Sequence, residues 1–373
     1  MNKTGFLFLT LFVLCFFSTG RSVAETGRFK KAVPGYVFVF PRDHGNHADY
    51  LIEWWYFTGH LKSSEGDIFG YELTFFRRGI ENKHTKGNPS KWVVRDIYLA
   101  HFAITDVSDK NFYYDEKISR EALGKAGSES GQMRVWIDDW SAMQAGEQMK
   151  LRAGKDLFQI DLILTPAKPP VIHGEGGISK KGEERGAASH YYSFTRLLTE
   201  GRLISEGKEK TVSGLSWMDH EFGSSVLGEG QAGWDWFSIQ LDDGSEYMFY
   251  QIREKDGAKA PTSSGTMVFP DGKQQHLKTT DFKLRPLEYW QSKKSGATYP
   301  VAWEISVPSE QLVLKSEPLL RAQELITDKS TRVTYWEGLS EFKGEKKGAA
   351  ISGKGYIELT GYGQVLGESA VRP

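Results

Sequence analysis

The sequence repeats one pattern of short β-strands in its two halves. In the first half, Trp54–Leu61 is followed by a glycine turn and then by Phe69–Arg77. In the second half, Trp234–Leu241 is followed by a glycine turn and then by Tyr247–Arg253. All four segments are rich in aromatic and β-branched residues, which favour strands. The same order of strand, turn and strand therefore occurs at two places in the chain.

Two further matches follow in the same order. The segment from Leu164-Thr-Pro166 onward corresponds to the segment from Val307-Pro308 onward. Ser213–Asp219 corresponds to Ser352–Glu358, because both begin with Ser-Gly and end with an aromatic residue two positions before an acidic one. Three matches in one order predict tandem copies of a single β unit. Each copy has the strand content of a small antiparallel barrel that can hold one ligand, and a β-sandwich is the alternative.

The composition supports an all-β chain. Aromatic residues make up 13% of the sequence and glycine occurs 40 times, a combination typical of short strands joined by many turns. Only Glu116–Lys125 and Glu317–Ile326 are expected to form short helices. We predict a first barrel domain over residues 30–222 and a second over 223–373, with the boundary inside Gly223–Gly233.

The N-terminus has the pattern of a secretory signal peptide. Lys3 provides a basic start, Gly5–Phe17 is apolar, and Ser22-Val23-Ala24 fits a cleavage site, so residues 1–24 are expected to be removed. The apolar run is too short to span a membrane. Cys15 is the only cysteine, and it lies in the removed segment. We therefore expect a periplasmic or secreted protein with no disulfide and no stable membrane anchor after cleavage.

Charge and motifs exclude several functional classes. The formal net charge is −1 and basic residues are not clustered, which argues against a nucleic-acid partner. The chain has no phosphate-binding loop, dinucleotide fingerprint or catalytic cysteine. Ser193 is not part of a G-x-S-x-G elbow. No organic cofactor is expected.

The densest group of ionisable and aromatic residues lies in Val212–Phe237. On an extended chain, Asp219 and Glu221 share a side with Trp217 while His220 points away. A carboxyl held against indole rings has a raised pKa and can give or take a proton near neutral pH. The alternative is a salt-bridged turn between the two domains, and the sequence leaves both open.

The first half holds further polar candidates. His44 and His47, with Asp43 and Asp49 beside them, could hold a metal, but loop capping is favoured because both histidines are expected on a loop. Glu53 shares a strand face with Trp55 and Phe57, and it is either part of a polar site or a partner for Arg77 or Arg78. The last candidate is His101, which alternates with Leu99 and Ala103 and is favoured as a structural histidine.

The longest motifs resemble those of the secreted AttH-like proteins, which are related to carotenoid 1,2-hydratases. The resemblance implies a calycin-type fold with two lipocalin-like barrels in tandem, in agreement with the repeat. It further implies relatives that add water to an isoprenoid carbon–carbon double bond, a phytoalexin hydratase, fungal cyclases, and secreted bacterial members labelled as hydrolases or lipid-related. The matching motifs are Phe40–His47, Glu53–Tyr56, Trp217–Gly223, Gly233–Phe237, Leu241–Gly244, Tyr335–Gly338 and Gly355–Tyr362.

These observations together predict a protein that binds an apolar isoprenoid or lipid ligand and acts as a hydratase. Hydration of an alkene needs an acid, aromatic faces that stabilise a cation, and a positioned water with a base. The expected catalytic residues are Asp219, Glu221, Asp235 and Tyr250, and the expected ligand-binding residues are His47, Glu53, Trp55, His101, Trp217, Trp234 and Trp236. A non-catalytic lipid carrier and a secreted hydrolase are the alternatives. A site in this region is expected to need both domains.

Overall fold

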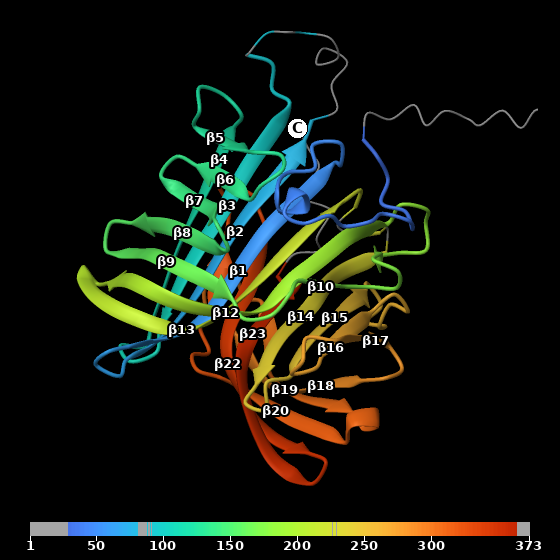
Figure 1. Cartoon of the computed structure of the whole chain (residues 1–373). Helices are drawn as coiled ribbons and strands as arrows, with labels where there is room; N and C mark the ends of the chain where they lie inside the picture. Colours follow the sequence, from blue (N-terminus) through green and yellow to red (C-terminus); the bar gives the residue numbers. More distant parts are fainter. Residues whose placement is uncertain are drawn as a thin grey trace, which may run out of the picture.

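Two antiparallel sheets contain almost all the regular structure (Figure 1). The computed structural model describes residues 29–80, 88, 90, 92–225, 227–228 and 230–363. The predicted signal peptide lies outside these residues and stays a prediction. Among the described residues, helical turns are limited to two 3₁₀ segments, η1 (Arg42–His44) and η2 (Pro308–Glu310). The prediction of an all-β protein with two lipocalin-like barrels is confirmed.

The first sheet has the order β4-β3-β2-β1-β13-β12-β9-β8-β7-β6-β5, and β10 and β11 pair with β12 outside this path. Its two end strands, β4 and β5, contact each other, so the barrel is nearly closed. Its strands are β1 (Ile52–Ser63), β2 (Ile68–Gly79), β3 (Asp96–Asp106), β4 (Asn111–Arg120), β5 (Ala126–Ser128), β6 (Arg134–Ile137), β7 (Trp140–Ala145), β8 (Gln148–Lys155), β9 (Phe158–Pro166), β10 (Val171–Ile172), β11 (Ser179–Lys180), β12 (Ala188–Ser205) and β13 (Lys208–Gly223).

The second sheet has the order β17-β16-β15-β14-β23-β22-β20-β19-β18 and forms a half-barrel, with β21 paired to β22. In both sheets the first strand lies between the second and the last, as a repeated unit requires. Its strands are β14 (Gln231–Leu241), β15 (Glu246–Glu254), β16 (Ser264–Val268), β17 (Gln274–Lys278), β18 (Lys283–Gln291), β19 (Thr298–Val307), β20 (Leu312–Pro318), β21 (Glu324–Ile326), β22 (Thr334–Lys346) and β23 (Ala349–Thr360).

The two expected helices are wrong. Glu116–Lys125 contains the end of β4 and a turn, and Glu317–Ile326 contains the end of β20 and β21. Both segments form strands because they pair with neighbouring strands: β4 pairs with β3 along its length, and β21 pairs with β22. Strand pairing with distant residues overrides the weak local preference. No helix among the described residues is long and apolar enough to cross a membrane.

Packed side chains fill the inner face of each sheet. In the first barrel, Trp55, Phe57 and Trp140 are almost completely buried in one apolar core. In the second, Trp303 and Trp336 are buried in the same way. Because the lipocalin-type ligand space is the barrel interior, these residues occupy the region where a lipocalin would hold its ligand. The remaining candidate place for a site is the surface between the barrels.

A third apolar cluster joins the outer faces of the two sheets. Tyr56 and Trp217 from the first barrel pack with Trp236, Leu339 and Tyr356 from the second. Figure 1 shows β12 beside β14 at the centre of the molecule, and β1 also contacts β23. Side chains alternate between the two faces of a strand, so each of these strands contributes to a barrel core on one face and to the interface on the other.

Gly70 in β2 lets the two sheets approach closely. A Cβ atom here would lie 2.3 Å from the Tyr356 hydroxyl and 2.8 Å from a Leu339 methyl. We expect Gly70→Ala to lower the free energy of unfolding by about 1–3 kcal/mol because of overpacking, measured by urea denaturation. Gly228→Ala is the control, since its Cβ would meet only the Gln231 side chain, at 3.5 Å. A Gly70→Ala protein as stable as wild type would contradict this account.

Candidate acid site between the two barrels

The alternation of side chains along β13 places Asp219 and Glu221 on the same side as Trp217, as the sequence predicts. Trp217, Asp219 and Glu221 lie on the interface side of the strand, where Trp217 packs with Trp236. His220 points to the opposite side and bonds Glu53 inside the first barrel. The alternation of a strand is sufficient for this division. The interface thus receives two carboxylates from one strand.

Asp219 is a buried carboxyl surrounded by hydrogen-bond donors. It accepts from Tyr191 Oη at 2.7 Å, from Trp217 Nε1 at 2.5 Å and from the Ser193 hydroxyl. Burial raises the pKa of Asp219 to about 7, although these hydrogen bonds oppose the shift. A group with this pKa exists in both protonation states near neutral pH, which is what a general acid or base needs.

Glu358 in β23 is the counterpart of Asp219 in the second barrel. Tyr56 lies opposite Asp219 in the β1–β13 pairing, and Trp236 lies opposite Glu358 in the β14–β23 pairing. Burial raises the pKa of Glu358 to about 7; a hydrogen bond from Trp234 opposes this, and the charge of Asp219 adds to it. The residue is half-buried and keeps contact with solvent. The repeated unit therefore supplies the interface with two acids of matched pKa.

Two further carboxyls complete what we call the acid cluster, which consists of Glu72, Asp219, Glu337 and Glu358. Glu337 lies directly opposite Glu358 in the β22–β23 pairing and accepts from Tyr56 Oη at 2.9 Å. Glu72 accepts from Thr74, and the remaining oxygens Glu72 Oε2 and Glu337 Oε1 are buried without a hydrogen-bond partner among the described residues. Burial raises the pKa of both groups well above the usual range. Like charges opposite each other are destabilising, so these acids are held neutral.

Aromatic side chains form the walls around the acid cluster. Tyr56 meets Trp236 edge to face with ring centroids 5.2 Å apart, and Trp217 meets Trp236 at 6.2 Å. Trp54 and Trp234 are half-buried at the edge of the same cluster. The negative faces of such rings stabilise a positive charge that develops between them.

Glu221 is part of a separate ion pair at the side of the cluster. It accepts from Lys181 Nζ at 2.7 Å and from Ser189. Lys181 Nζ lies 4.6 Å from the centre of the Tyr250 ring, while the Tyr250 hydroxyl donates to the Lys180 carbonyl at 2.8 Å. Glu221 and Tyr250 thus lie beside the acid cluster and hold a buried cation there.

Asp235 faces away from the acid cluster because it lies between Trp234 and Trp236 on β14. It pairs with Arg253 and accepts from Tyr362 Oη at 2.8 Å. Burial raises the pKa of Asp235, and the Arg253 charge opposes that shift. The structure therefore separates Asp235 from the acids that it neighbours in sequence.

The polar residues of the first half form a different cluster. His47 Nδ1 and His220 Nε2 both bond Glu53 Oε1, at 2.8 and 2.9 Å, and Arg77 Nε donates to Glu53 Oε2 at 2.9 Å. Trp55 stacks on His220 with centroids 4.7 Å apart. The three ligand-type residues His47, Glu53 and His220 are near enough to share a metal ion, but the Arg77 guanidinium on the same carboxylate would repel one. The arrangement is a complete hydrogen-bond network that includes the Glu53–Arg77 pair.

His101 lies at the interface but has both ring nitrogens bonded. Nδ1 is 2.6 Å from Tyr335 Oη and Nε2 is 2.9 Å from Ser330 Oγ. Burial lowers the pKa of His101 to about 3, so the ring is neutral. His101 lies in the first barrel and its partners Tyr335 and Ser330 lie in the second. His101 therefore has a structural role in holding the two barrels together.

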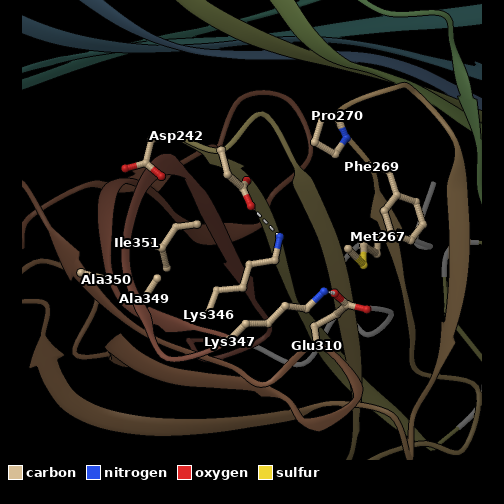
Figure 2. A pocket seen from close by; sticks show the side chains of 11 residues that line it. Asp242, Met267, Phe269, Pro270, Glu310, Lys346, Lys347, Ala349, Ala350 and Ile351 are labelled. Atoms are coloured by element: carbon tan, nitrogen blue, oxygen red, sulfur yellow. Dashed lines mark hydrogen bonds and ion pairs between the residues drawn. The ribbon is translucent and has the colours of Figure 1, made fainter.

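Two hollows differ in size and place. Beside the acid cluster, a hollow of about 10 Å³ is lined by Thr58, His60, Trp217, Gln240 and Tyr356, among others, and has room for about one water. At the end of the second barrel, a hollow of about 430 Å³ is open to solvent (Figure 2). Ion pairs mark its rim, Lys346–Asp243 at 2.7 Å and Lys347–Glu310 at 3.4 Å, and its apolar walls are Met267, Phe269 and Ile351.

The sequence matches one protein family over most of its length. The profile of a family described as AttH-like matches residues 31–362. The crystal structure of an AttH protein from Nitrosomonas europaea superimposes with a TM-score of 0.80 and is 34% identical, covering 90% of this chain and 100% of that chain. The predicted family resemblance is confirmed.

Two fungal proteins are more distant. Kievitone hydratase from Nectria haematococca superimposes with a TM-score of 0.67 at 13% identity, over 91% of this chain and 98% of that chain, which shows a shared fold. The dehydratase asqC of Emericella nidulans is 20% identical over 219 residues, or 57% of this chain. The aligned part spans 60% of the length of that relative.

Proposed function

Because the chain belongs to the AttH-like family, we propose that it is a hydratase or dehydratase whose active site is the acid cluster between the two barrels. The observation that carries this proposal is the pair Asp219 and Glu358, two carboxyls with a pKa of about 7 enclosed by aromatic rings. The names of the two fungal relatives, a hydratase and a dehydratase, support the reaction class. The ligand proposed is an apolar isoprenoid or lipid alkene.

The groups around the cluster supply the acid, the base and the aromatic faces that hydration needs. Asp219 transfers its proton to one alkene carbon, which leaves a cation on the other. The faces of Tyr56, Trp217 and Trp236 stabilise that cation. Water then attacks the cation while Glu358 takes the proton that the water loses. The reverse sequence is dehydration of the alcohol. Substrate entry is expected next to Glu358, the half-buried member of the cluster.

The hydrolase alternative has less support in this region. Ser193 lies 2.6 Å from His173 Nε2 and donates to Asp219, so its hydroxyl connects the two groups. His173 Nδ1 bonds Thr266 and not a carboxylate. In a catalytic triad the acid holds the histidine, whereas here it accepts from the serine.

A non-catalytic carrier is the second candidate. It is favoured by the open hollow of about 430 Å³ at the end of the second barrel, a volume typical of small-molecule sites (Figure 2). Under either function we propose that the mature chain works in the periplasm or outside the cell, as its N-terminal sequence predicts.

The hydratase proposal is tested with the mature protein and its co-purified ligand. The ligand is extracted and identified by mass spectrometry, and it and isoprenoid alkenes are then incubated in water labelled with heavy oxygen. We expect labelled alcohol from the wild type and a rate about 10²–10⁴ lower for Asp219→Asn, because a general acid is removed.

Asp235→Asn is the matched control, since it changes the same residue type on β14, the next strand along the chain, where Asp235 faces away from the acid cluster. Its activity should stay near that of the wild type while circular dichroism confirms its fold. Full activity of Asp219→Asn would remove Asp219 from the mechanism. Ligand release without any labelled alcohol would favour the carrier.

A further inference from the structure

The proposed hydration leaves Asp219 without its proton and Glu358 with one more. Each turnover therefore requires a proton to return to Asp219, which is only 4% exposed. The indole rings of Trp217 and Trp236 cannot pass a proton on, because an indole N–H only donates. A route for that proton must consist of groups that both donate and accept hydrogen bonds.

A continuous row of such groups lies behind Asp219. The Ser193 hydroxyl donates to Asp219 Oδ1, His173 Nε2 is 2.6 Å from Ser193 Oγ, and His173 Nδ1 is 2.8 Å from Thr266 Oγ1. Ser193, His173 and Thr266 are each at most 1% exposed. The row starts in the first barrel and ends on β16 in the second.

The hydrogen bonds of the row all point toward Asp219. The single proton of Ser193 is given to Asp219, so Ser193 Oγ accepts from His173 Nε2–H. A neutral imidazole then has Nδ1 free to accept from the Thr266 hydroxyl. Burial lowers the pKa of His173 to about 3, with the charge of Lys181 adding to the shift, which keeps the ring neutral. Each donor can hand its proton forward.

The chain around His173 fixes the ring in this place. His173 follows β10, whose Ile172 is held from both sides by one side chain of the second barrel: Gln274 Oε1 accepts from Ile172 N at 3.0 Å, and Gln274 Nε2 donates to Ile172 O at 2.6 Å. The His173 ring lies 4.2 Å from the Tyr191 ring. These contacts hold the His173 ring at the junction of the two barrels.

The outer end of the row approaches solvent. Thr266 lies opposite His276 in the β16–β17 pairing. His276 is half-buried, and its Nδ1 has no hydrogen-bond partner among the described residues. Burial lowers the pKa of His276, and the charges of Glu175 and Asp281 oppose that shift. His276 and Thr266 are register partners on adjacent strands, so their side chains lie on the same face of the sheet.

We propose that Thr266, His173 and Ser193 form a proton relay that carries protons from the surface near His276 to Asp219. A proton arrives at Thr266 Oγ1, the Thr266 proton moves to His173 Nδ1, the Nε2 proton moves to Ser193 Oγ, and the Ser193 proton moves to the Asp219 carboxylate. One proton enters and one is delivered, so the row keeps its composition. Rotation of the two hydroxyls and tautomerisation of the ring restore the inward orientation. The use of the relay in turnover rests on the proposed function.

The relay is tested without any substrate, in the full mature protein. After a rapid drop in pH, time-resolved infrared spectroscopy follows the carbonyl band of protonated Asp219, identified by its loss in Asp219→Asn. Thr266→Val keeps the shape of the side chain but removes the hydroxyl. His173→Gln keeps a donor and an acceptor but cannot pass a proton through. Both variants are expected to slow the protonation of Asp219 about tenfold or more without moving its titration midpoint.

Thr199→Val is the control, because Thr199 is a buried threonine outside the row, and it should keep the wild-type rate. Wild-type rates in both relay variants would overturn the relay. A shifted midpoint with an unchanged rate would assign the row a structural role and would also overturn it. If Thr266→Val does not fold, the rate of Asp219 protonation in His173→Gln is sufficient to test the relay. Since no catalysis is measured, a failed relay and a failed hydratase proposal are distinguished.

Discussion

At pH 8, Glu337→Gln is expected to stabilise the folded protein. Glu337 is almost fully buried, lies opposite Glu358 and leaves one oxygen unbonded among the described residues. Burial and the neighbouring acids raise the pKa of Glu337 in the folded state, whereas the unfolded chain ionises it near its ordinary value. The stability it contributes is present below that ordinary value and is lost as pH rises through the folded pKa. Glutamine is neutral at every pH and still accepts from Tyr56, so the gain is on the order of 2 kcal/mol.

The measurement is urea denaturation between pH 6.5 and 9. The free energy of unfolding of the wild type should fall across this range, because Glu72, Asp219, Glu337 and Glu358 all have raised pKa values. The buried histidines with lowered pKa values are neutral in the folded state, and in the unfolded chain they lose their protons around pH 6.5, so they contribute little above about pH 7.5.

Glu337→Gln should make this dependence shallower. Glu317→Gln is the control, since Glu317 is exposed, and it should follow the wild-type curve. Equal loss of stability in Glu337→Gln at pH 5 and pH 8 would show that Glu337 is ionised in the folded protein.

The second large effect is expected at Glu246, where the two barrels are joined by ion pairs. Glu246 is completely buried on β15, and it accepts from Lys168 Nζ at 2.7 Å and from Arg196 Nε at 2.5 Å. Lys168 also donates to the Gly244 and Phe269 carbonyls, at 2.6 and 3.0 Å. Both cations come from the first barrel, so the carboxylate is the centre of an inter-barrel contact.

Glu246→Ala leaves two cations without their anion, and we expect a loss of about 3–5 kcal/mol. Thermal unfolding should separate into two transitions as the barrels lose contact, and limited proteolysis should cut within 224–230, between the sheets. Glu288→Ala is the matched control because it breaks an exposed pair with Arg321 at 2.6 Å, and its cost should be about 0–1 kcal/mol. One unchanged transition in Glu246→Ala would mean that apolar packing alone holds the barrels together.

The acid site could be predicted in part. Strand alternation places Asp219 and its neighbour Trp217 on one face, and the repeat aligns Asp219 with Glu358 along the chain. No cluster of acids marks Glu72 or Glu337 in the sequence, because each is one acid within a strand, although Glu337 lies in the family motif Tyr335–Gly338. Their role depends on the packing of β2 and β22 against each other across the interface. The alternation on β14 could also have excluded Asp235, whose side chain must point opposite to Trp234 and Trp236.

By itself, the sequence determined the fold class, the repeated unit, the family and the face on which Asp219 lies. These properties depend on the period of two in a strand and on motifs read along the chain, so they are local. The tertiary structure decided which acids meet, which are paired with cations and which hydroxyls reach Asp219. Those properties depend on burial and on contacts between residues far apart in sequence, such as Tyr56 with Glu337 and His173 with Thr266. A pKa responds to that environment, and therefore the chemistry of the site appears only when the two barrels are packed together.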